Sequence, residues 1–171
     1  MNAKSKSASA AVNRPKVVVE RTYRARVDEL WDLWTTKNGF ESWWGPGGFR
    51  VEVHTLEARV GGALHYHMIA DAPEQIEAMR RMGRPTSHET RGTFAEMRRH
   101  ERLAVTHMID FLPEVKSYKS TMVAEFFPSG DSVRMVVTLD PMHDENFTKM
   151  QTMGFTSQLT KLDKQFGQVK R

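Results

Sequence analysis

The C-terminal stretch of the chain carries one continuous apolar stripe. Asp144 suits the N-cap of a helix, because its carboxylate can accept hydrogen bonds from the first free backbone N–H groups, and the helix dipole favours an acidic residue at Glu145. The pattern predicts a helix from residue 144 to about residue 168, since small and apolar residues spaced three and four apart form one face of a helix. That face consists of Phe147, Met150, Gly154, Phe155, Leu159, Leu162 and Phe166.

Most of the remaining chain alternates between apolar and polar positions, as strands with one covered face do. Two short helices are predicted at residues 29–36, capped by Asp28, and at residues 40–44. A third helix is predicted at residues 73–83, and a polar loop at residues 85–91. The predicted strands are residues 16–25, 49–59, 63–70, 93–98, 103–111, 119–127 and 133–139.

These elements predict an α+β fold. Strands joined by short turns are antiparallel, and one apolar face per strand means that one side of the sheet is covered. The C-terminal helix is the only predicted element large enough to cover that side. We therefore expect a curved antiparallel sheet of about six or seven strands wrapped around the long C-terminal helix, with two short helices after the first strand.

Composition and charge narrow the function classes. The chain has 171 residues, a size typical of one domain, and no cysteine, which excludes disulfides and thiolate chemistry. Its net charge is +4, and basic residues without an acid occupy the N-terminus. We expect a disordered basic tail at residues 1–15 and a single domain at residues 16–171. We expect a cytoplasmic protein with no membrane span. No nucleic-acid partner is expected, because no basic stripe is interleaved with aromatic residues.

Several short motifs resemble those of a known family. Residues 43–46 are Trp-Trp-Gly-Pro, and residues 60–62 are Val-Gly-Gly before a predicted strand. Further matches are Gly-Thr-Phe-Ala-Glu at 92–96, Glu-Arg-Leu-Ala-Val-Thr-His at 101–107 and Val-Arg-Met at 133–135. From about residue 17 to residue 166 the sequence resembles the START-like (SRPBCC, Bet-v-type) superfamily, in its branch named for the activator of the heat-shock-protein-90 ATPase (AHSA-type). The resemblance implies a helix-grip fold with an apolar cavity between the sheet and the C-terminal helix.

The resemblance does not imply one activity, because the superfamily includes lipid carriers, polyketide cyclases and hormone binders. Our leading hypothesis is binding of an apolar or amphipathic small molecule in the cavity. Gly154 indicates space there, since glycine within a helix costs about 1 kcal/mol relative to alanine, although it could instead allow close packing of helix on sheet. The residues expected to line the cavity are Trp44, Tyr66, Met68, Val105, His107, Met135, Val137, Met150, Gly154 and Phe155.

His107 and Tyr66 are the polar candidates in this cavity. A neutral imidazole could act as a general base near pH 7, which gives the alternative of a non-covalent enzyme of the cyclase or hydrolase type. The spacing assigns no carboxylate partner, so His107 could equally be a core histidine bonded to a backbone carbonyl or to Tyr66. No catalytic residue is therefore assigned. His143, which precedes Asp144, is interpreted as a loop residue beside the helix cap.

Three histidines are candidate metal ligands. His65 and His67 share one strand face, and His54 falls on the same face if the hairpin loop has an even number of residues. Three imidazoles there could bind zinc or nickel. This face is opposite Leu64 and Tyr66 and should be exposed, and no supporting carboxylate is evident. We therefore expect no metal and no other cofactor.

A third hypothesis is a stress-related interaction protein that resembles the chaperone-ATPase activator. The eukaryotic activator carries an additional N-terminal domain that contacts the chaperone, and this sequence leaves no room for it, so a chaperone partner is not expected. A homodimer is compatible with the sequence. The helix at residues 73–83 could close over the cavity as a lid, decorate the surface or form a dimer contact.

Overall fold

A computed structural model describes residues 14–110, 112 and 114–169 of the chain. The part of the expected basic tail before residue 14 lies outside these residues. The described residues form seven strands and four helices. These elements are β1 (Val17–Tyr23), α2 (Val27–Thr35), α3 (Lys37–Glu41), β2 (Phe49–Leu56), β3 (Ala63–Ala70), α4 (Pro73–Arg81), β4 (Ser87–Arg98), β5 (Arg102–Ile109), β6 (Tyr118–Ser129), β7 (Ser132–Leu139) and α5 (Glu145–Phe166).

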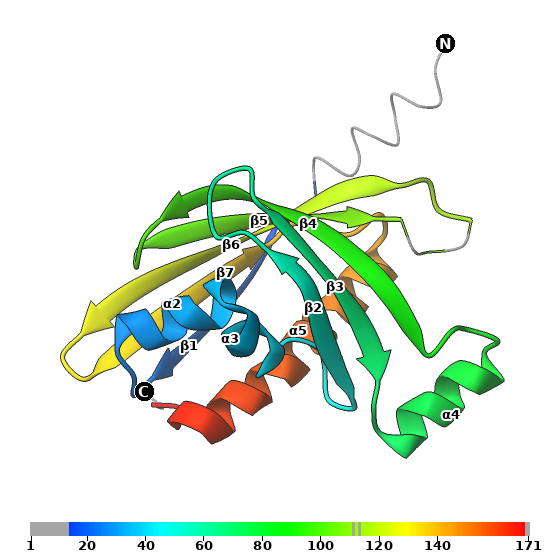
Figure 1. The fold of residues 1–171 in the computed structure, drawn as a ribbon, viewed down its shortest axis with the longest axis horizontal. Helices are drawn as coiled ribbons and strands as arrows, with labels where there is room; N and C mark the ends of the chain where they lie inside the picture. Colours follow the sequence, from blue (N-terminus) through cyan, green and yellow to red (C-terminus); the bar gives the residue numbers. More distant parts are fainter. Residues whose placement is uncertain (1–13, 111, 113, 170–171) are drawn as a thin grey trace, which may run out of the picture.

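All seven strands belong to one antiparallel sheet with the order β1-β7-β6-β5-β4-β3-β2. Strands β2 to β7 follow one another along the chain, and β1 joins the far edge beside β7. The sheet curls into a half-barrel, and α5 lies along its concave side (Figure 1). The expected α+β fold with a sheet gripping the C-terminal helix is confirmed.

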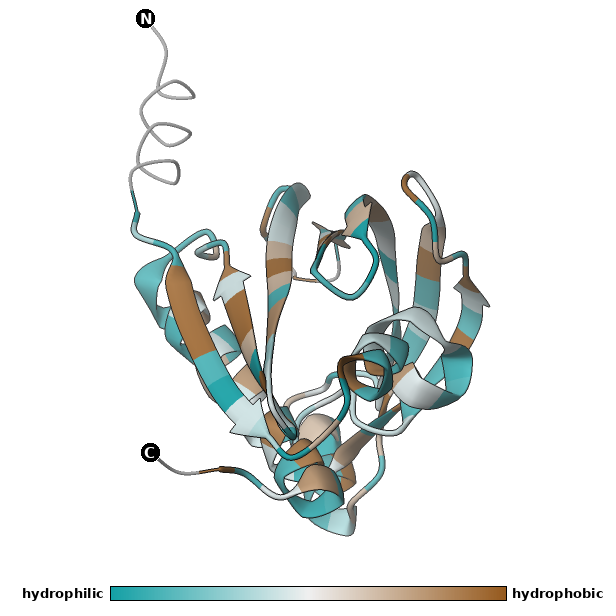
Figure 2. Cartoon of the chain, turned by 90° about the vertical axis from the view of Figure 1, so that its left-hand side faces the viewer, coloured by the Kyte–Doolittle hydropathy of each residue, from teal (hydrophilic) through white to brown (hydrophobic). Residues whose placement is uncertain are grey.

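The core lies between the concave face of the sheet and helices α2, α3 and α5 (Figure 2). Alternate residues of the strands point into it, as the period of two requires. The tryptophans that precede β2 fill one end of the half-barrel together with α2. The core residues from the strands are Tyr23, Val51, Val53, Leu64, Phe94, Leu103, Val105, Phe126, Val133, Met135, Val137 and Leu139.

The two halves of α5 differ in packing. In the C-terminal half, Phe155, Leu159 and Leu162 are buried, and the Tyr23 hydroxyl donates to the Asp163 carboxylate at 2.9 Å. In the N-terminal half, none of residues 145–154 is buried. Only the second half therefore anchors the helix to the sheet.

Two helix starts differ from the sequence-based prediction. α2 begins at Val27 and its N-cap is Arg26, so the expected cap at Asp28 is wrong. Glu29 stabilises this start instead, because its carboxylate accepts a hydrogen bond from Arg26 N at 2.9 Å. α3 lies at Lys37–Glu41 rather than at residues 40–44, since the Thr36 hydroxyl caps it by accepting from Gly39 N at 3.0 Å.

The polar loop expected at residues 85–91 is also wrong, because β4 already begins at Ser87. The inward-facing side chains at the start of β4 are polar, with Thr90 buried and His88 half-buried. An apolar alternation is therefore missing where the strand starts. By contrast, the expected cap of α5 is confirmed, since Asp144 Oδ1 accepts from Phe147 N at 2.7 Å.

Among the described helices, none combines the length and the hydropathy that crossing a bilayer requires.

Candidate functional site

A chain of three polar side chains runs across the buried concave face. The indole Nε1 of Trp44 donates to the Tyr66 hydroxyl at 2.9 Å, and that hydroxyl lies 3.1 Å from Nε2 of His107. All three side chains are buried, and the Trp44 and His107 rings stack with centroids 6.1 Å apart. The two polar residues proposed for the interior are thus in direct contact there.

The Tyr66 hydroxyl is the central group of this chain. The indole N–H can only donate, so the Tyr66 oxygen accepts from it. The direction of the hydrogen bond between the hydroxyl and Nε2 of His107 is set by the tautomer of the imidazole. Thr90 is a further hydrogen-bond partner of the same hydroxyl.

Both titratable groups of the chain are uncharged at neutral pH. Burial lowers the pKa of His107 to about 4, because the imidazolium loses its hydration. Burial also raises the pKa of Tyr66 above its ordinary value, and hydrogen bonds from Trp44 and from Thr90, its cross-strand neighbour, offset this only in part. The interior polar chain thus carries no charge.

Gly92 makes the contact between Tyr66 and His107 possible. Tyr66 lies on β3 and His107 on β5, and the intervening strand β4 places Gly92 directly beside His107. A Cβ atom at Gly92 would lie 3.2 Å from the His107 ring and 3.2 Å from Thr106 O. The glycine thus leaves room for the His107 ring, whose Nε2 contacts the Tyr66 hydroxyl. Ser120 borders His107 on the other side, on β6, and is also buried.

The loop before β2 holds Trp44 in place, because α5 binds its backbone. Gln158 Oε1 accepts from Gly45 N at 3.0 Å, and the Ser157 hydroxyl accepts from Gly47 N at 2.9 Å. The Lys161 ammonium donates to Gly45 O at 2.8 Å and to Phe49 O at 2.9 Å, and burial lowers its pKa. The Trp-Trp-Gly-Pro motif is thus fixed to the anchored half of α5.

Polar side chains also occur on the face of α5 that looks toward the sheet. Phe155 packs against the Trp44 ring with centroids 6.4 Å apart, which fixes the direction of this face. Gln151 lies one turn before Phe155, on the same face, about 6 Å along the helix. Its Oε1 is buried and has no hydrogen-bond partner among the described residues, as is also true of Nε2 of Gln158. Gln151 therefore presents an unsatisfied acceptor to the interior.

The structure divides the ten residues predicted to line the cavity into three groups. Those in the packed interior are Trp44, Tyr66, Val105, His107, Met135, Val137 and Phe155. Met68 and Gly154 are half-buried, and a Cβ at Gly154 would meet only Pro46, at 4.0 Å. Met150 is 52% exposed. Of the apolar stripe in the first half of α5, Gly154 thus lies beside the loop before β2, and Met150 faces largely to solvent.

Sequence and structure comparisons place the chain among known proteins. The sequence model described as "Activator of Hsp90 ATPase homolog 1-like protein", AHSA1, matches residues 24–167. The chain belongs to this family. Among curated proteins, none matches the AHSA1 chain.

Solved structures share the fold of this AHSA1 protein. A crystal structure from Chromobacterium violaceum has a TM-score of 0.69 at 16% identity and covers 90% of this chain and 99% of its own. An AHSA1 protein from Silicibacter pomeroyi has a TM-score of 0.68 at 17% identity, with 88% and 96% covered. A solution structure from Arthrobacter aurescens has a TM-score of 0.69 at 17% identity, with 86% and 83% covered. At such identities the likeness shows the fold alone.

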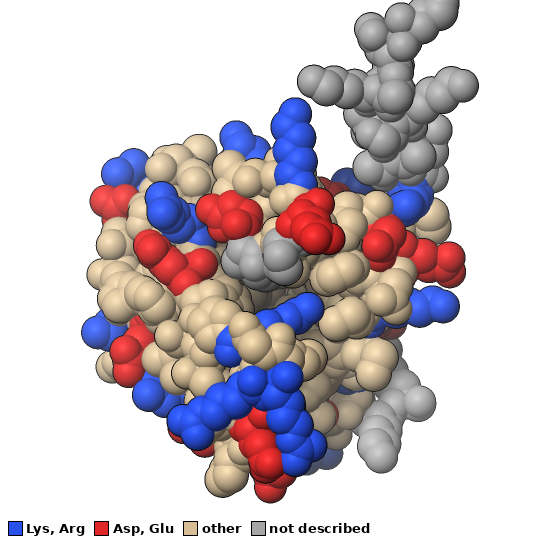
Figure 3. All heavy atoms as spheres, turned by 90° about the vertical axis from the view of Figure 1, so that its right-hand side faces the viewer, with Lys and Arg blue, Asp and Glu red and all other residues tan. Residues whose placement is uncertain are grey.

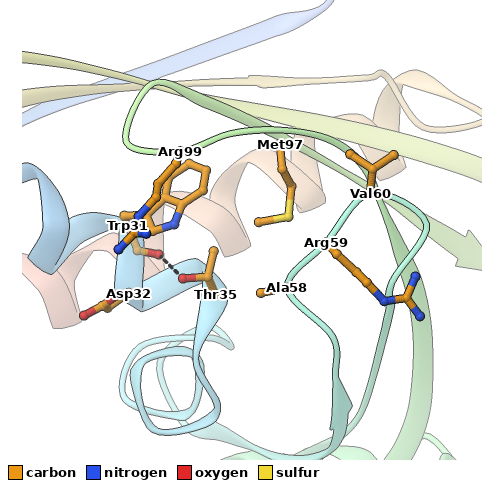
Figure 4. A pocket seen from close by; sticks show the side chains of 8 residues that line it. All are labelled: Trp31, Asp32, Thr35, Ala58, Arg59, Val60, Met97 and Arg99. Atoms are coloured by element: carbon orange, nitrogen blue, oxygen red, sulfur yellow. Dashed lines mark hydrogen bonds between the residues drawn. The ribbon is translucent and has the colours of Figure 1, made fainter.

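Two surface pockets of this AHSA1 protein have no lining residue from α5. One, of about 440 Å³, lies between α2, the turn after β2 and the end of β4 (Figure 4). Another, of about 710 Å³, is a groove on the outer face of the sheet. Neither includes any of the ten residues predicted to line the cavity. The first pocket is lined by Trp31, Asp32, Thr35, Ala58, Arg59, Val60, Met97 and Arg99.

His143 is held at the start of α5. Its Nδ1 lies 2.9 Å from the Tyr118 hydroxyl, and its backbone N donates to the same hydroxyl at 3.2 Å. Its Nε2 lies 3.6 Å from the Asp144 carboxylate, and its ring packs on Phe147. Asp144 itself is occupied as the helix cap. This arrangement fits the interpretation of His143 as a loop residue beside the helix cap.

α4 extends from one end of the half-barrel (Figure 1). Its start is bound to the loop before β2, because Asp71 N and Ala72 N donate to Gly48 O at 2.8 and 3.1 Å. Figure 3 looks at this end and shows acidic and basic side chains interspersed, with basic ones gathered over α4. None of the α4 residues is buried, although Ile76 and Met79 are half-buried. A role of α4 as a lid stays a prediction.

Several site residues of the AHSA1 protein were missed by sequence reasoning. Thr90 and Ser120 look like ordinary polar strand positions, and only the register places them beside Tyr66 and His107. Gln151 carried a detectable signal, because it falls on the apolar stripe four residues before Phe155. A polar residue on the buried face of a predicted helix is the pattern that could have identified it.

The three histidines considered as metal ligands separate in the structure. His54 and His67 are in contact on the outer face of β2 and β3. His65 instead lines the outer groove with Arg91, Asp110 and other residues. In the part of the chain that the structure describes, no three His, Asp or Glu side chains converge on one point that could hold a metal ion.

Proposed function

We propose that this AHSA1 protein binds a neutral amphipathic small molecule between the concave face of its sheet and the first half of α5. The observation that carries the proposal is a buried hydrogen-bond acceptor, Gln151 Oε1 on α5, which has no partner among the described residues. A buried polar atom without a partner costs about 1–3 kcal/mol. A ligand group that donates a hydrogen bond to Gln151 would offset this cost.

The charge of the interior determines the class of ligand. Tyr66 and His107 are uncharged at neutral pH, and the side chains of Gln151, Thr90 and Ser120 carry no charge at any pH. A buried carboxylate or phosphate without a cationic partner would be strongly disfavoured. The polar part of the ligand is therefore a hydroxyl, carbonyl or amide rather than an anion.

The apolar part of the ligand would lie against soft side chains near the same residues. Met68 follows Tyr66 by two positions on β3, and Met122 is the cross-strand neighbour of Val105. Both methionines are half-buried, so they have space to move, and the flexible thioether adapts to an irregular guest. Ile109 lies two positions after His107 on the same face. An apolar surface with a few convergent polar groups is typical of small-molecule sites.

Membership of the AHSA1 family supports this proposal, because the START-like fold sets a long helix against a curved sheet. The alternative of an acid–base enzyme requires a group that titrates near the working pH. The lowered pKa of His107 makes it a weak base at neutral pH, and its hydrogen bond to Tyr66 supplies no negative charge. These two facts favour binding over catalysis.

Native mass spectrometry of the freshly purified full chain tests the proposal. We expect a small organic molecule bound to the folded protein and released on denaturation. Ser120→Leu should abolish this adduct, because Ser120 is buried beside His107 and the larger side chain occupies the same space. Thr93→Leu is the matched control, since Thr93 is exposed and its β4 position faces outward. A wild-type protein without an adduct, or an adduct that persists in Ser120→Leu, would contradict the proposal.

A further inference from the structure

Two imidazoles meet on the outer face of the sheet, on the side opposite the proposed ligand. Nε2 of His54 on β2 contacts Nδ1 of His67 on β3. The two rings stand edge to face, with centroids 4.6 Å apart and planes at 86°. His54 is exposed and His67 is half-buried, so both can be reached from solvent.

A β-bulge brings these rings together. Val53 pairs with Tyr66 and Thr55 pairs with His65, so His54 is an extra residue on β2 without its own partner on β3. A bulge re-aims the side chain of the extra residue. His65 lies on the same face of β3 but does not join the pair.

Two ring nitrogens in contact require something between them. In neutral imidazoles one of the two must carry a hydrogen, because two lone pairs that face each other repel. A divalent cation can take the place of that hydrogen and accept both lone pairs, once the hydrogen has moved to the other nitrogen of its own ring. Zn–N bonds are about 2.0–2.1 Å long, which puts two nitrogens on a tetrahedral ion about 3.3 Å apart. The rings would separate slightly, and the exposed His54 side chain is free to turn.

Carboxylates flank the pair on both sides. His67 pairs across the sheet with Glu52 on β2 and with Glu89 on β4, so both acids share its outer face. Each acid forms an ion pair with an arginine. The Glu52 carboxylate lies 2.8 Å from the Arg50 guanidinium, and the Glu89 carboxylate lies 3.6 Å from the Arg91 guanidinium. Among the described residues no three ligands converge, so a carboxylate would have to rotate to join the two histidines.

We propose that His54 and His67 bind a divalent transition-metal cation such as Zn²⁺, Cu²⁺ or Ni²⁺ on the outer face of the sheet, with Glu52 as the third protein ligand. Imidazole nitrogens suit these ions, whereas Mg²⁺ and Ca²⁺ take oxygen ligands. The cation links β2 to β3 across the bulge. Because it binds only the folded arrangement, it stabilises the protein by mass action.

The test uses the full chain without a histidine tag, freed of metal with a chelator. Isothermal titration with ZnCl₂ is expected to show one saturable site, and 0.1 mM Zn²⁺ is expected to raise the Tm by about 3–5 °C. Addition of 1 mM Mg²⁺ should leave the Tm unchanged. The absence of saturable Zn²⁺ binding below 1 mM would overturn the proposal.

Variants locate the site. His54→Gln and His67→Gln should each weaken Zn²⁺ binding at least about tenfold, whereas the matched control His65→Gln should keep the wild-type affinity. Glu52→Gln should weaken Zn²⁺ binding less than either histidine variant, because the Glu52 carboxylate must rotate to reach the cation and so contributes less to binding than the two imidazoles. All four positions are on the outer face, so circular dichroism should show intact folding. Unchanged affinity in His54→Gln, or equal losses in His65→Gln, would refute this site.

Discussion

Replacing Leu162 by alanine is expected to lower the free energy of unfolding by about 3–5 kcal/mol. Leu162 is fully buried in the half of α5 that anchors the helix to the sheet. The truncation removes apolar surface from the core and leaves a cavity that its neighbours fill only in part. Urea unfolding followed by circular dichroism measures the loss.

Met150→Ala is the matched control on the same helix. Met150 is 52% exposed, so its truncation is expected to cost less than about 0.5 kcal/mol. Losses of equal size in the two variants would contradict the division of α5 into an anchored half and a loosely packed half.

Between pH 7 and pH 4.5, His107 alone is expected to remove about 2–3 kcal/mol from the stability of the protein. Its pKa in the folded state is about 4, below the value of about 6.5 for an unfolded chain. Between these two values the unfolded chain binds more protons than the folded protein. The contribution is therefore fully present above about pH 6.5 and is lost as the pH falls toward 4.

Urea unfolding of three proteins at both pH values isolates this contribution. In His107→Gln the loss between pH 7 and pH 4.5 should be smaller than in the wild type by about 2–3 kcal/mol, because the other titrating groups remain. His65→Gln, on the outer face, should retain nearly the full loss. If His107→Gln shows the same pH dependence as the wild type, the imidazole is not held neutral by burial.

The fold was largely predictable from the sequence, and each wrongly predicted element has a physical cause. The stripe of α5 and the alternation of β3, β5 and β7 expose one apolar face each, and such faces determine how elements pack. The start of β4 escaped because His88 and Thr90 point inward, so the strand shows no apolar alternation there. A strand whose inward-facing residues are polar is not predicted by hydrophobic alternation alone.

The site was predictable only in part. Tyr66 and His107 share a face with apolar neighbours and could be placed in the interior from alternation alone. Their hydrogen bond spans a third strand, in which Gly92 lies beside His107. The order of strands in a sheet cannot be derived from the residue pattern of a single strand. The pairing of His54 with His67 depends on a bulge, which shifts the register by one residue without a sequence signal that we could identify.

Because the polar groups of the interior carry no charge, we propose a neutral ligand rather than an anion of the kind that basic protein surfaces bind. The polar chain from Trp44 to His107 would recognise a group that can exchange hydrogen bonds, and Gln151 would approach it from α5. The outer face of the same sheet would hold a cation at His54 and His67. The two sites use opposite faces of β3, because successive residues of a strand alternate in direction.

NMR titration of the ¹⁵N-labelled full chain tests the interior site most directly. Decan-1-ol and decanoate serve as probes of equal chain length, one neutral and one anionic at pH 7.5. Decan-1-ol should shift the Gln151 side-chain amide and the backbone amides of Tyr66 and His107 in a saturable manner, while decanoate should leave them unchanged. Interior signals that do not respond to decan-1-ol, or that respond more strongly to decanoate, would contradict a neutral binding site between the sheet and α5.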